Sequence, residues 1–317
     1  MRGTRLHLVA FLALLGAGWG ASQPLAKIAV SEGYRHFGLV FWQLVIGAVL
    51  LGAVLLIRRR PLPLGAPYFW RYAVIALIGT VLPNSASYQA AVHLPAGVIS
   101  ILLSLVPMFA FPIALAMGTD RFGWARFGGL LCGLAGVLLI VGPEASLPDA
   151  ALVAFIPLAL IAPAFYALEA NVVAKWGVLD LDPVQLLFGA CVTGALIALP
   201  LAVASGQWID PGPPWGLPDL AVVISSTIHA VVYCGYVWLV GRAGSVFAAQ
   251  VSYLVTAFGV LWAMAILGER YTGFVWAAMV VMFLGLFLVQ PRPGPRPTGT
   301  PRAETLAATP RRGKDRA

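Results

Sequence analysis

Polar residues are scarce in this chain, and several recur four residues apart inside long apolar runs, which stacks them on one face of a helix. The residues with this spacing are Trp19, Gln23 and Lys27; Asn84 and Tyr88; and Ser225, His229 and Tyr233. Indole, amide, hydroxyl and imidazole groups bind small polar molecules through hydrogen bonds, and imidazole can also carry a proton. The pattern therefore indicates ligand binding or proton transfer among apolar helices.

Such stripes must point into the protein, because unsatisfied donors and acceptors facing lipid are costly. We expect them to line a central substrate cavity formed by Trp19, Gln23, Asn84, Tyr88, Tyr166, His229, Tyr233, Gln250 and Tyr253. The candidate coupling or gate charges are Lys27, Glu169 and His229. Each residue also has a structural alternative: the amides and hydroxyls can join helices, aromatic rings can simply pack, and the end-of-run charges can reach an interface.

Enzyme motifs are missing from the chain. It contains no HExxH, no P-loop, no GxSxG and no pair of intramembrane aspartates, and no stretch remains for a nucleotide-binding domain. Cys132, Cys191 and Cys234 lie singly in apolar runs, without a CxxC pair. We therefore expect no enzyme activity, no cofactor and no metal site.

Composition places the chain in the membrane. Of its 317 residues, 60% are hydrophobic and only 10% charged, and the mean hydropathy is +0.90. A bilayer core requires roughly 20 apolar helical residues per crossing. Ten stretches meet this approximately, near 7–28, 38–57, 72–92, 96–117, 124–142, 151–172, 185–204, 220–240, 245–267 and 272–290. The first stretch also resembles a signal peptide, but removing it would break the symmetry of the two halves.

The apolar pattern occurs twice. Leu105-Val106 followed by Asp120-Arg121 recurs as Leu254-Val255 followed by Glu269-Arg270, at a constant offset of 149. Each half contains five spans, so the second copy enters the membrane from the opposite side. This predicts two inverted repeats, 1–142 and 151–290, an architecture typical of alternating-access transporters.

Basic residues predict the orientation. With a cytoplasmic N-terminus, only Arg35 and Arg270 fall in outer connections, so both termini should be cytoplasmic. The net charge of +8 is then a topology signal and not a sign of nucleic-acid binding. Residues 291–317, rich in proline and basic residues, should form a disordered cytoplasmic tail.

Both halves resemble EamA domains of the drug/metabolite transporter superfamily. The resemblance rests on motifs that recur in order, among them Trp19-Gly20 with Lys27, Pro95-Ala96-Gly97, Ser104-Leu105-Val106-Pro107, Gly118-Thr119-Asp120-Arg121 and Leu267-Gly268-Glu269-Arg270. It covers all ten spans and implies an all-α membrane protein with ten transmembrane helices in two inverted five-helix repeats. Asp120 replaces the usual glutamate, and Thr256 stands where the first half has Pro107.

Together these patterns favour a multi-pass secondary transporter of a bacterial inner membrane. It would take a small-molecule substrate within the lipid bilayer and bind no nucleic acid. The resemblance implies export of small metabolites such as amino acids. The alternatives are an uptake carrier, a flippase for a lipid-linked metabolite and, from another class, an intramembrane lipid-modifying enzyme.

Overall fold

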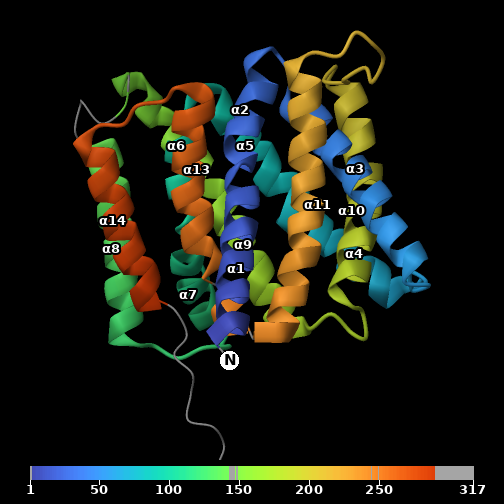
Figure 1. The fold of residues 1–317 in the computed structure, drawn as a ribbon, viewed down its shortest axis with the longest axis horizontal. Helices are drawn as coiled ribbons and strands as arrows, with labels where there is room; N and C mark the ends of the chain where they lie inside the picture. The colour runs from blue at the N-terminus through green and yellow to red at the C-terminus, as the bar shows by residue number, and fades with distance from the viewer. Residues whose placement is uncertain (1, 143–146, 148, 244, 249, 290–317) are drawn as a thin grey trace, which may run out of the picture.

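The computed structural model describes residues 2–289 apart from 143–146, 148, 244 and 249 (Figure 1). Throughout that part of the chain the regular structure is helical, and no strand occurs. The tail expected at 291–317 lies outside the described residues. The elements in chain order are α1 (Arg2–Gly20), α2 (Ser22–Ser31), α3 (His36–Ile57), α4 (Ala66–Ala76), η1 (Leu77–Val81), α5 (Leu82–His93), α6 (Ala96–Leu103), α7 (Val106–Ala116), α8 (Trp124–Val141), η2 (Ala150–Phe155), α9 (Ile156–Trp176), α10 (Pro183–Ala204), α11 (Leu217–Ala243), α12 (Ser245–Ala248), α13 (Val251–Leu267) and α14 (Gly273–Val289).

Within the described residues, seven helical segments are long and apolar enough to cross a membrane. They are Leu6–Ser31, His36–Ile57, Ala96–Ala116, Trp124–Val141, Ala150–Trp176, Pro183–Ala204 and Leu217–Ala243. The helices α13 and α14 are apolar but shorter, and α4, η1 and α5 form one unbroken helical run over 66–93. For the described residues, the prediction of an all-α chain is confirmed, and seven of its helical segments are candidate membrane spans.

The helices stand side by side, and the closest pairs join segments far apart in the sequence. Figure 1 shows α8 against α14 at one end of the bundle and α10 against α3 and α4 at the other. Between them, α1 packs on α13, and α11 packs on both α2 and α3. The largest apolar core gathers residues from both halves, including Leu102 and Met282, which are almost fully buried.

Three runs are interrupted near prolines. The first run breaks at Ala21, three residues before Pro24; the third contains the π-helical turn η1 just before Pro83; and the fourth breaks at Ser104–Leu105, just before Pro107. Proline has no backbone N–H and cannot continue the hydrogen-bond ladder, so it favours a new helix start. The breaks at Ala21 and η1 lie beside the cavity described below.

Glycine permits the closest helix contacts. A Cβ added to Gly129 on α8 would lie 2.7 Å from the carbonyl oxygen of Gly285 on α14, and one added to Gly285 would lie 2.8 Å from the oxygen of Gly129. Any larger residue at either position would push α8 and α14 apart. This is the use that small residues have in membrane helix packing.

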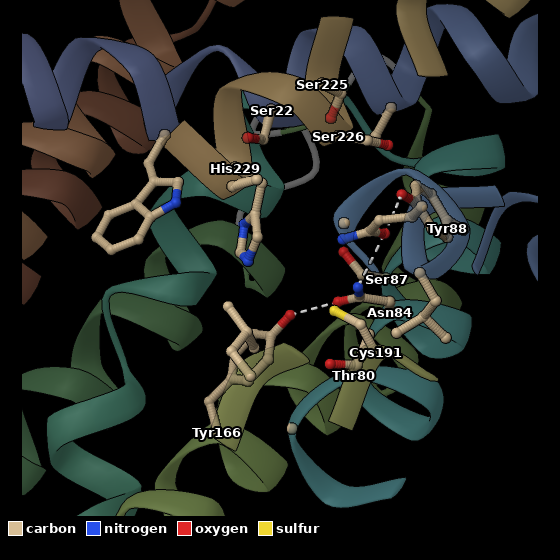
Figure 2. Close-up of a pocket in the computed structure, with 18 of the residues that line it drawn as sticks. Ser22, Thr80, Asn84, Ser87, Tyr88, Tyr166, Cys191, Ser225, Ser226 and His229 are labelled. Carbon is tan, nitrogen blue, oxygen red and sulfur yellow. Dashed lines mark hydrogen bonds between the residues drawn. The ribbon is translucent and has the colours of Figure 1, made fainter. Parts of the chain in front are cut away.

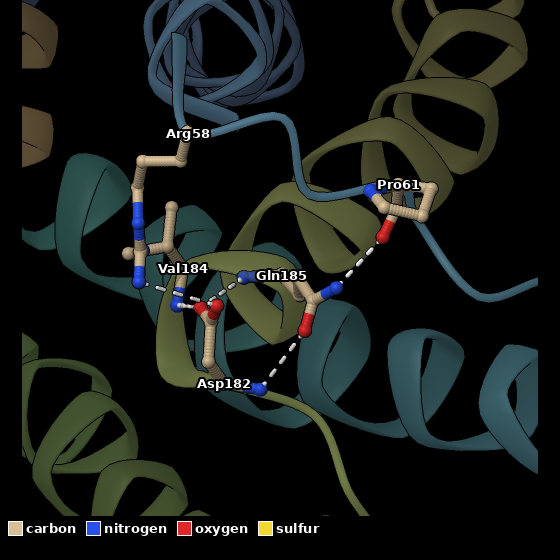
Figure 3. A network of polar contacts seen from close by, with 5 residues as sticks. All are labelled: Arg58, Pro61, Asp182, Val184 and Gln185. Atoms are coloured by element: carbon tan, nitrogen blue, oxygen red, sulfur yellow. Dashed lines mark hydrogen bonds and ion pairs between the residues drawn. The ribbon is translucent and has the colours of Figure 1, made fainter. Parts of the chain in front are cut away.

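Polar contacts fix both ends of the bundle. At one end, Asp182 caps α10 in a capping box with Gln185, whose Nε2 donates to the oxygen of Pro61 at 2.7 Å, while Arg58 pairs with Asp182 at 3.5 Å (Figure 3). At the other, the Tyr34 hydroxyl donates to Asp219 Oδ1 at 2.5 Å. Burial first, and then this contact, raise the pKa of Tyr34 to about 12.

Candidate binding cavity

A cavity of about 230 Å³ lies among the helices, and residues of both halves of the chain line it. Its walls come from the α1–α2 break, α3, η1, α5, α9, α10 and α11, with single residues of α6 and α13. The hydrogen-bonding side chains in the lining are Trp19, Ser22, Gln23, Gln43, Thr80, Asn84, Ser87, Tyr88, Tyr166, Ser225, Ser226 and His229. The described lining contains no Asp, Glu, Lys or Arg.

One wall is a complete chain of hydrogen bonds. The Tyr166 hydroxyl donates to Asn84 Oδ1 at 2.5 Å, and Asn84 Nδ2 donates to Gln43 Oε1 at 3.0 Å. The Tyr88 hydroxyl donates to the same Gln43 oxygen at 2.8 Å. Figure 2 shows the Tyr166 hydroxyl directed at Asn84. This network joins α3, α5 and α9 and holds their polar groups in place.

The wall on the α1–α2 side is different, because its polar atoms have no partners. Trp19 Nε1, Ser22 Oγ and Gln23 Oε1 are buried without a hydrogen bond in the structure. The His229 ring lies beside the Trp19 ring, with centroids 6.1 Å apart, and Figure 2 shows His229 reaching into the space between Ser22 and Tyr166. Buried polar groups are nearly always paired, so a cluster of unpaired ones is unusual.

Six of the residues predicted from the stripes line this cavity: Trp19, Gln23, Asn84, Tyr88, Tyr166 and His229. The other three lie elsewhere. Tyr233 is half-buried on α11, about one turn beyond His229 and outside the lining. Gln250 is exposed in the connection between α12 and α13, and the Tyr253 ring packs on Phe283 with centroids 5.6 Å apart.

Lys27, a candidate gate charge, lies outside the lining and contacts the end of α5. Its Nζ donates to the carbonyl oxygen of Ala91 at 2.7 Å and to those of Val92 and Leu94 at 3.2 Å. Cations are stabilised at helix C-termini, where carbonyls lack helical partners. This contact fixes α2 against the α5–α6 joint.

Glu169, the second candidate, lies behind the lining. Its carboxylate packs on Gly79 of the π-helical turn, so that a Cβ at residue 79 would come within 2.5 Å of Oε1 and 2.6 Å of Cδ. Gly79 and the next residue, Thr80, both line the cavity. Among the described residues, the Glu169 carboxylate on α9 thus contacts a residue of the lining without being part of the lining itself.

The amino-acid sequence matches a known family over most of its length. The model of the EamA-like transporter family fits residues 7–142 and again 154–290. The chain belongs to the EamA-like transporter family. This confirms the resemblance found in the motifs, and the long apolar helices agree with a multi-pass membrane protein.

Two curated relatives of this EamA-like transporter are similar over parts of their length. A probable terminal-alkyne amino-acid exporter of Streptantibioticus cattleyicolor is 28% identical over 127 residues, which is 38% of this chain and 40% of the exporter. A chloroplastic WAT1-related protein of Arabidopsis thaliana is 22% identical over 277 residues, 86% of this chain and 66% of that protein. The chain thus spans less than two thirds of each relative.

A solved structure shares the fold. A protein crystal structure matches the EamA-like transporter with a TM-score of 0.61 at 17% sequence identity, covering 87% of this chain and 94% of the other. At that identity the likeness concerns the fold alone.

The stripe analysis missed one central residue of the cavity, Gln43. Gln43 Oε1 accepts two hydrogen bonds, yet no second polar residue at helical spacing accompanies it in the run 38–57. The available signal was its isolation, since a lone amide in an otherwise apolar span needs a partner. Ser22, Thr80 and Ser87 were also missed, because small hydroxyl residues are common in membrane helices. Across the described residues, no group of three or more His, Cys, Asp or Glu could hold a metal ion.

Proposed function

We propose that this EamA-like transporter is a secondary transporter of a bacterial inner membrane that exports small metabolites, with amino acids as the foremost candidates, and that it is not an enzyme. The observation that carries the proposal is a small polar cavity enclosed by apolar helices, with unpaired groups on one wall. Its volume of about 230 Å³ is below the roughly 300–1,000 Å³ of pockets for drug-sized ligands.

The proposed architecture has ten spans in two inverted repeats, 1–142 and 151–290, with both termini in the cytoplasm. Three observations support it: the family model fits twice, the helical runs fall near the ten apolar stretches, and the start of α1 and the end of α14 lie at the same end of the bundle (Figure 1). Alternating access would then be rocking of the repeats around the cavity.

Export of amino acids is supported by one relative's description as a probable amino-acid exporter. We assign substrate contact to Trp19, Gln23, Asn84, Tyr88, Tyr166 and His229, which line the cavity. His229, Lys27 and Glu169 remain the candidate coupling or gate charges. Lys27 fits a gate better than a substrate contact, because it joins α2 to the α5–α6 joint outside the lining.

Counterflow in proteoliposomes tests this function. Purified protein is reconstituted into vesicles preloaded with one unlabelled amino acid, nucleoside or sugar at a time, and uptake of the labelled compound is measured against protein-free vesicles. We expect transient accumulation of at least one amino acid. Accumulation of none of the panel would contradict the metabolite-transporter proposal.

Cysteine substitutions along the α11 face from Ser225 to Tyr236 distinguish the remaining alternatives. A metabolite transporter should react with a water-soluble thiol reagent at the cavity-lining positions only, in a background lacking the three native cysteines. A flippase would be favoured if a lipid-soluble thiol reagent, entering through a lateral opening between helices, blocks the reaction with the water-soluble reagent. Accessibility confined to one interface would favour an enzyme acting on lipid.

A further inference from the structure

The two polar walls of the cavity differ in what they can offer a ligand. On the wall formed by Gln43, Asn84, Tyr88 and Tyr166, three hydrogen bonds join the side chains and occupy both tyrosine hydroxyl protons and Gln43 Oε1. On the α1–α2 wall, the atoms Trp19 Nε1, Ser22 Oγ and Gln23 Oε1 have no partner. Each such buried group lowers the stability of the fold, and three within five residues indicate a compensating role.

These three groups also form a chemically mixed set. Trp19 Nε1 is a donor only, Gln23 Oε1 is an acceptor only, and the Ser22 hydroxyl can act either way. His229 lies beside them, with its ring centroid 6.1 Å from that of Trp19, and adds a ring nitrogen that can donate. A ligand group that satisfies this wall must therefore both donate and accept hydrogen bonds at neighbouring atoms.

Charge restricts the ligand further. Within the described lining there is no charged side chain, and Glu169 is held behind Gly79. A ligand with a net charge would lie uncompensated among apolar helices, at a high free-energy cost. A different pair of helices, α3 and α10, supplies an apolar lining that includes Leu44, Leu51 and Leu187, which suits an uncharged hydrocarbon side chain.

We propose that the wall formed by Trp19, Ser22, Gln23 and His229 binds the polar head of a zwitterionic, net-neutral amino acid whose side chain lies against α3 and α10. The carboxylate accepts from Trp19 Nε1 and a His229 ring N–H, and the ammonium group donates to Gln23 Oε1 and Ser22 Oγ. This assignment rests on the proposed transport function and adds to it the binding group for each half of the zwitterion.

The assignment is tested in counterflow with a labelled neutral amino acid. The corresponding amine and the corresponding acid, each of which carries a net charge, are added as competitors. The variants are Trp19→Phe, Ser22→Ala and Gln23→Leu. Matched controls are Tyr253→Phe and Ser85→Ala, which remove equally buried and unpartnered hydroxyls outside the cavity. Folding is followed by thermal stability in detergent.

We expect each cavity variant to raise the half-saturating amino-acid concentration about tenfold, the loss typical of a hydrogen bond to a charged group. In the wild-type protein, the amine and the acid should each compete far more weakly than the unlabelled amino acid, because each carries a net charge. Thermal stability should stay equal or rise, because each change removes an unpaired buried group. A residue with only a structural role would not give this combination.

Two results would overturn the assignment while the transport function stands. One is unchanged half-saturation in all three cavity variants, as in the controls; the other is wild-type preference for a cationic amino acid or a phosphorylated compound. Failure of the wild-type protein to accumulate any compound of the panel is a different outcome, because it overturns the proposed transport function as well.

Discussion

Lys27 and Glu269 lie on the two sides of the joint between α5 and α6, one at each helix end. Lys27 Nζ donates to the oxygen of Ala91 at 2.7 Å, near the C-terminus of α5, and Glu269 Oε1 accepts from the backbone N–H of Ala96 at 2.8 Å, at the N-terminus of α6. The positive charge meets free carbonyls and the negative charge meets free N–H groups, as the helix dipoles favour. Glu269 comes from the second half of the chain, so the joint links the halves.

Replacing Glu269 with glutamine should destabilise this joint. The carboxylate accepts from Ala96 and Gly97, and Tyr271 also donates to it. An amide has a single acceptor oxygen, so we expect a loss of about 1–3 kcal/mol in the free energy of unfolding. Thermal unfolding in detergent measures it, with Glu32→Gln as the control for the same change at an exposed residue. Equal stability of the two variants would contradict the capping role.

Replacing Lys27 with methionine tests the gate assignment. The variant keeps the length of the side chain but loses all three contacts with the end of α5, so the exchange rate in counterflow should fall severalfold. Lys175→Met is the matched control, because among the described residues Lys175 Nζ donates to one carbonyl oxygen, that of Met117, at 2.9 Å. If both variants exchange at the wild-type rate, Lys27 has no gating role.

Replacing His229 with alanine should abolish counterflow while the protein still folds and inserts. The ring reaches into the cavity beside Trp19, where it can contact substrate or carry a proton. His93→Ala makes the same change outside the cavity, at a ring stacked on Phe155, and should leave transport intact. Near-normal flux through correctly inserted His229→Ala would contradict the assignment.

Periodicity and apolar content predicted an all-helical chain with long apolar helices, because both depend on local sequence. They did not predict the conformation of the chain where a run breaks. The interruption at Ala21 and the π-helical turn η1 depend on how the carbonyls before Pro24 and Pro83 are satisfied by neighbouring helices. Both breaks border the cavity, and the prolines that follow them indicate their positions but not their conformations.

The cavity residues also divide into those that local sequence indicates and those that only tertiary packing specifies. Asn84 and Tyr88 were predictable, because an i, i+4 pair of polar residues must share a helix face. Their common partner Gln43 was not, since the contact crosses 41 residues to Asn84 and only tertiary packing specifies it. Tyr253 shows the converse, because a polar residue in an apolar run can be buried without reaching the cavity.

Replacing Gln43 with leucine should impair both stability and binding. The change keeps the approximate volume but leaves the Asn84 amide and the Tyr88 hydroxyl without their acceptor, which costs about 1–3 kcal/mol for each buried donor. The double variant Gln43→Leu/Tyr88→Phe should recover part of that loss. Thermal unfolding and half-saturation in counterflow are the measurements, and Gln250→Leu is the control at an exposed amide. No recovery in the double variant would argue against a shared acceptor.

Replacing Gly79 with alanine should displace the Glu169 carboxylate and lower thermal stability, because the new Cβ would lie 2.5 Å from Glu169 Oε1. Gly241→Ala is the control: nothing lies within 4 Å of its Cβ, so it should gain up to about 1 kcal/mol from helix propensity. The double variant Gly79→Ala/Glu169→Ala removes the clash and should restore thermal stability. If Glu169 is a coupling charge, the double variant will fold normally and still fail to transport, as will Glu169→Ala alone. Full flux through the folded double variant would leave the Glu169 carboxylate with a packing role only.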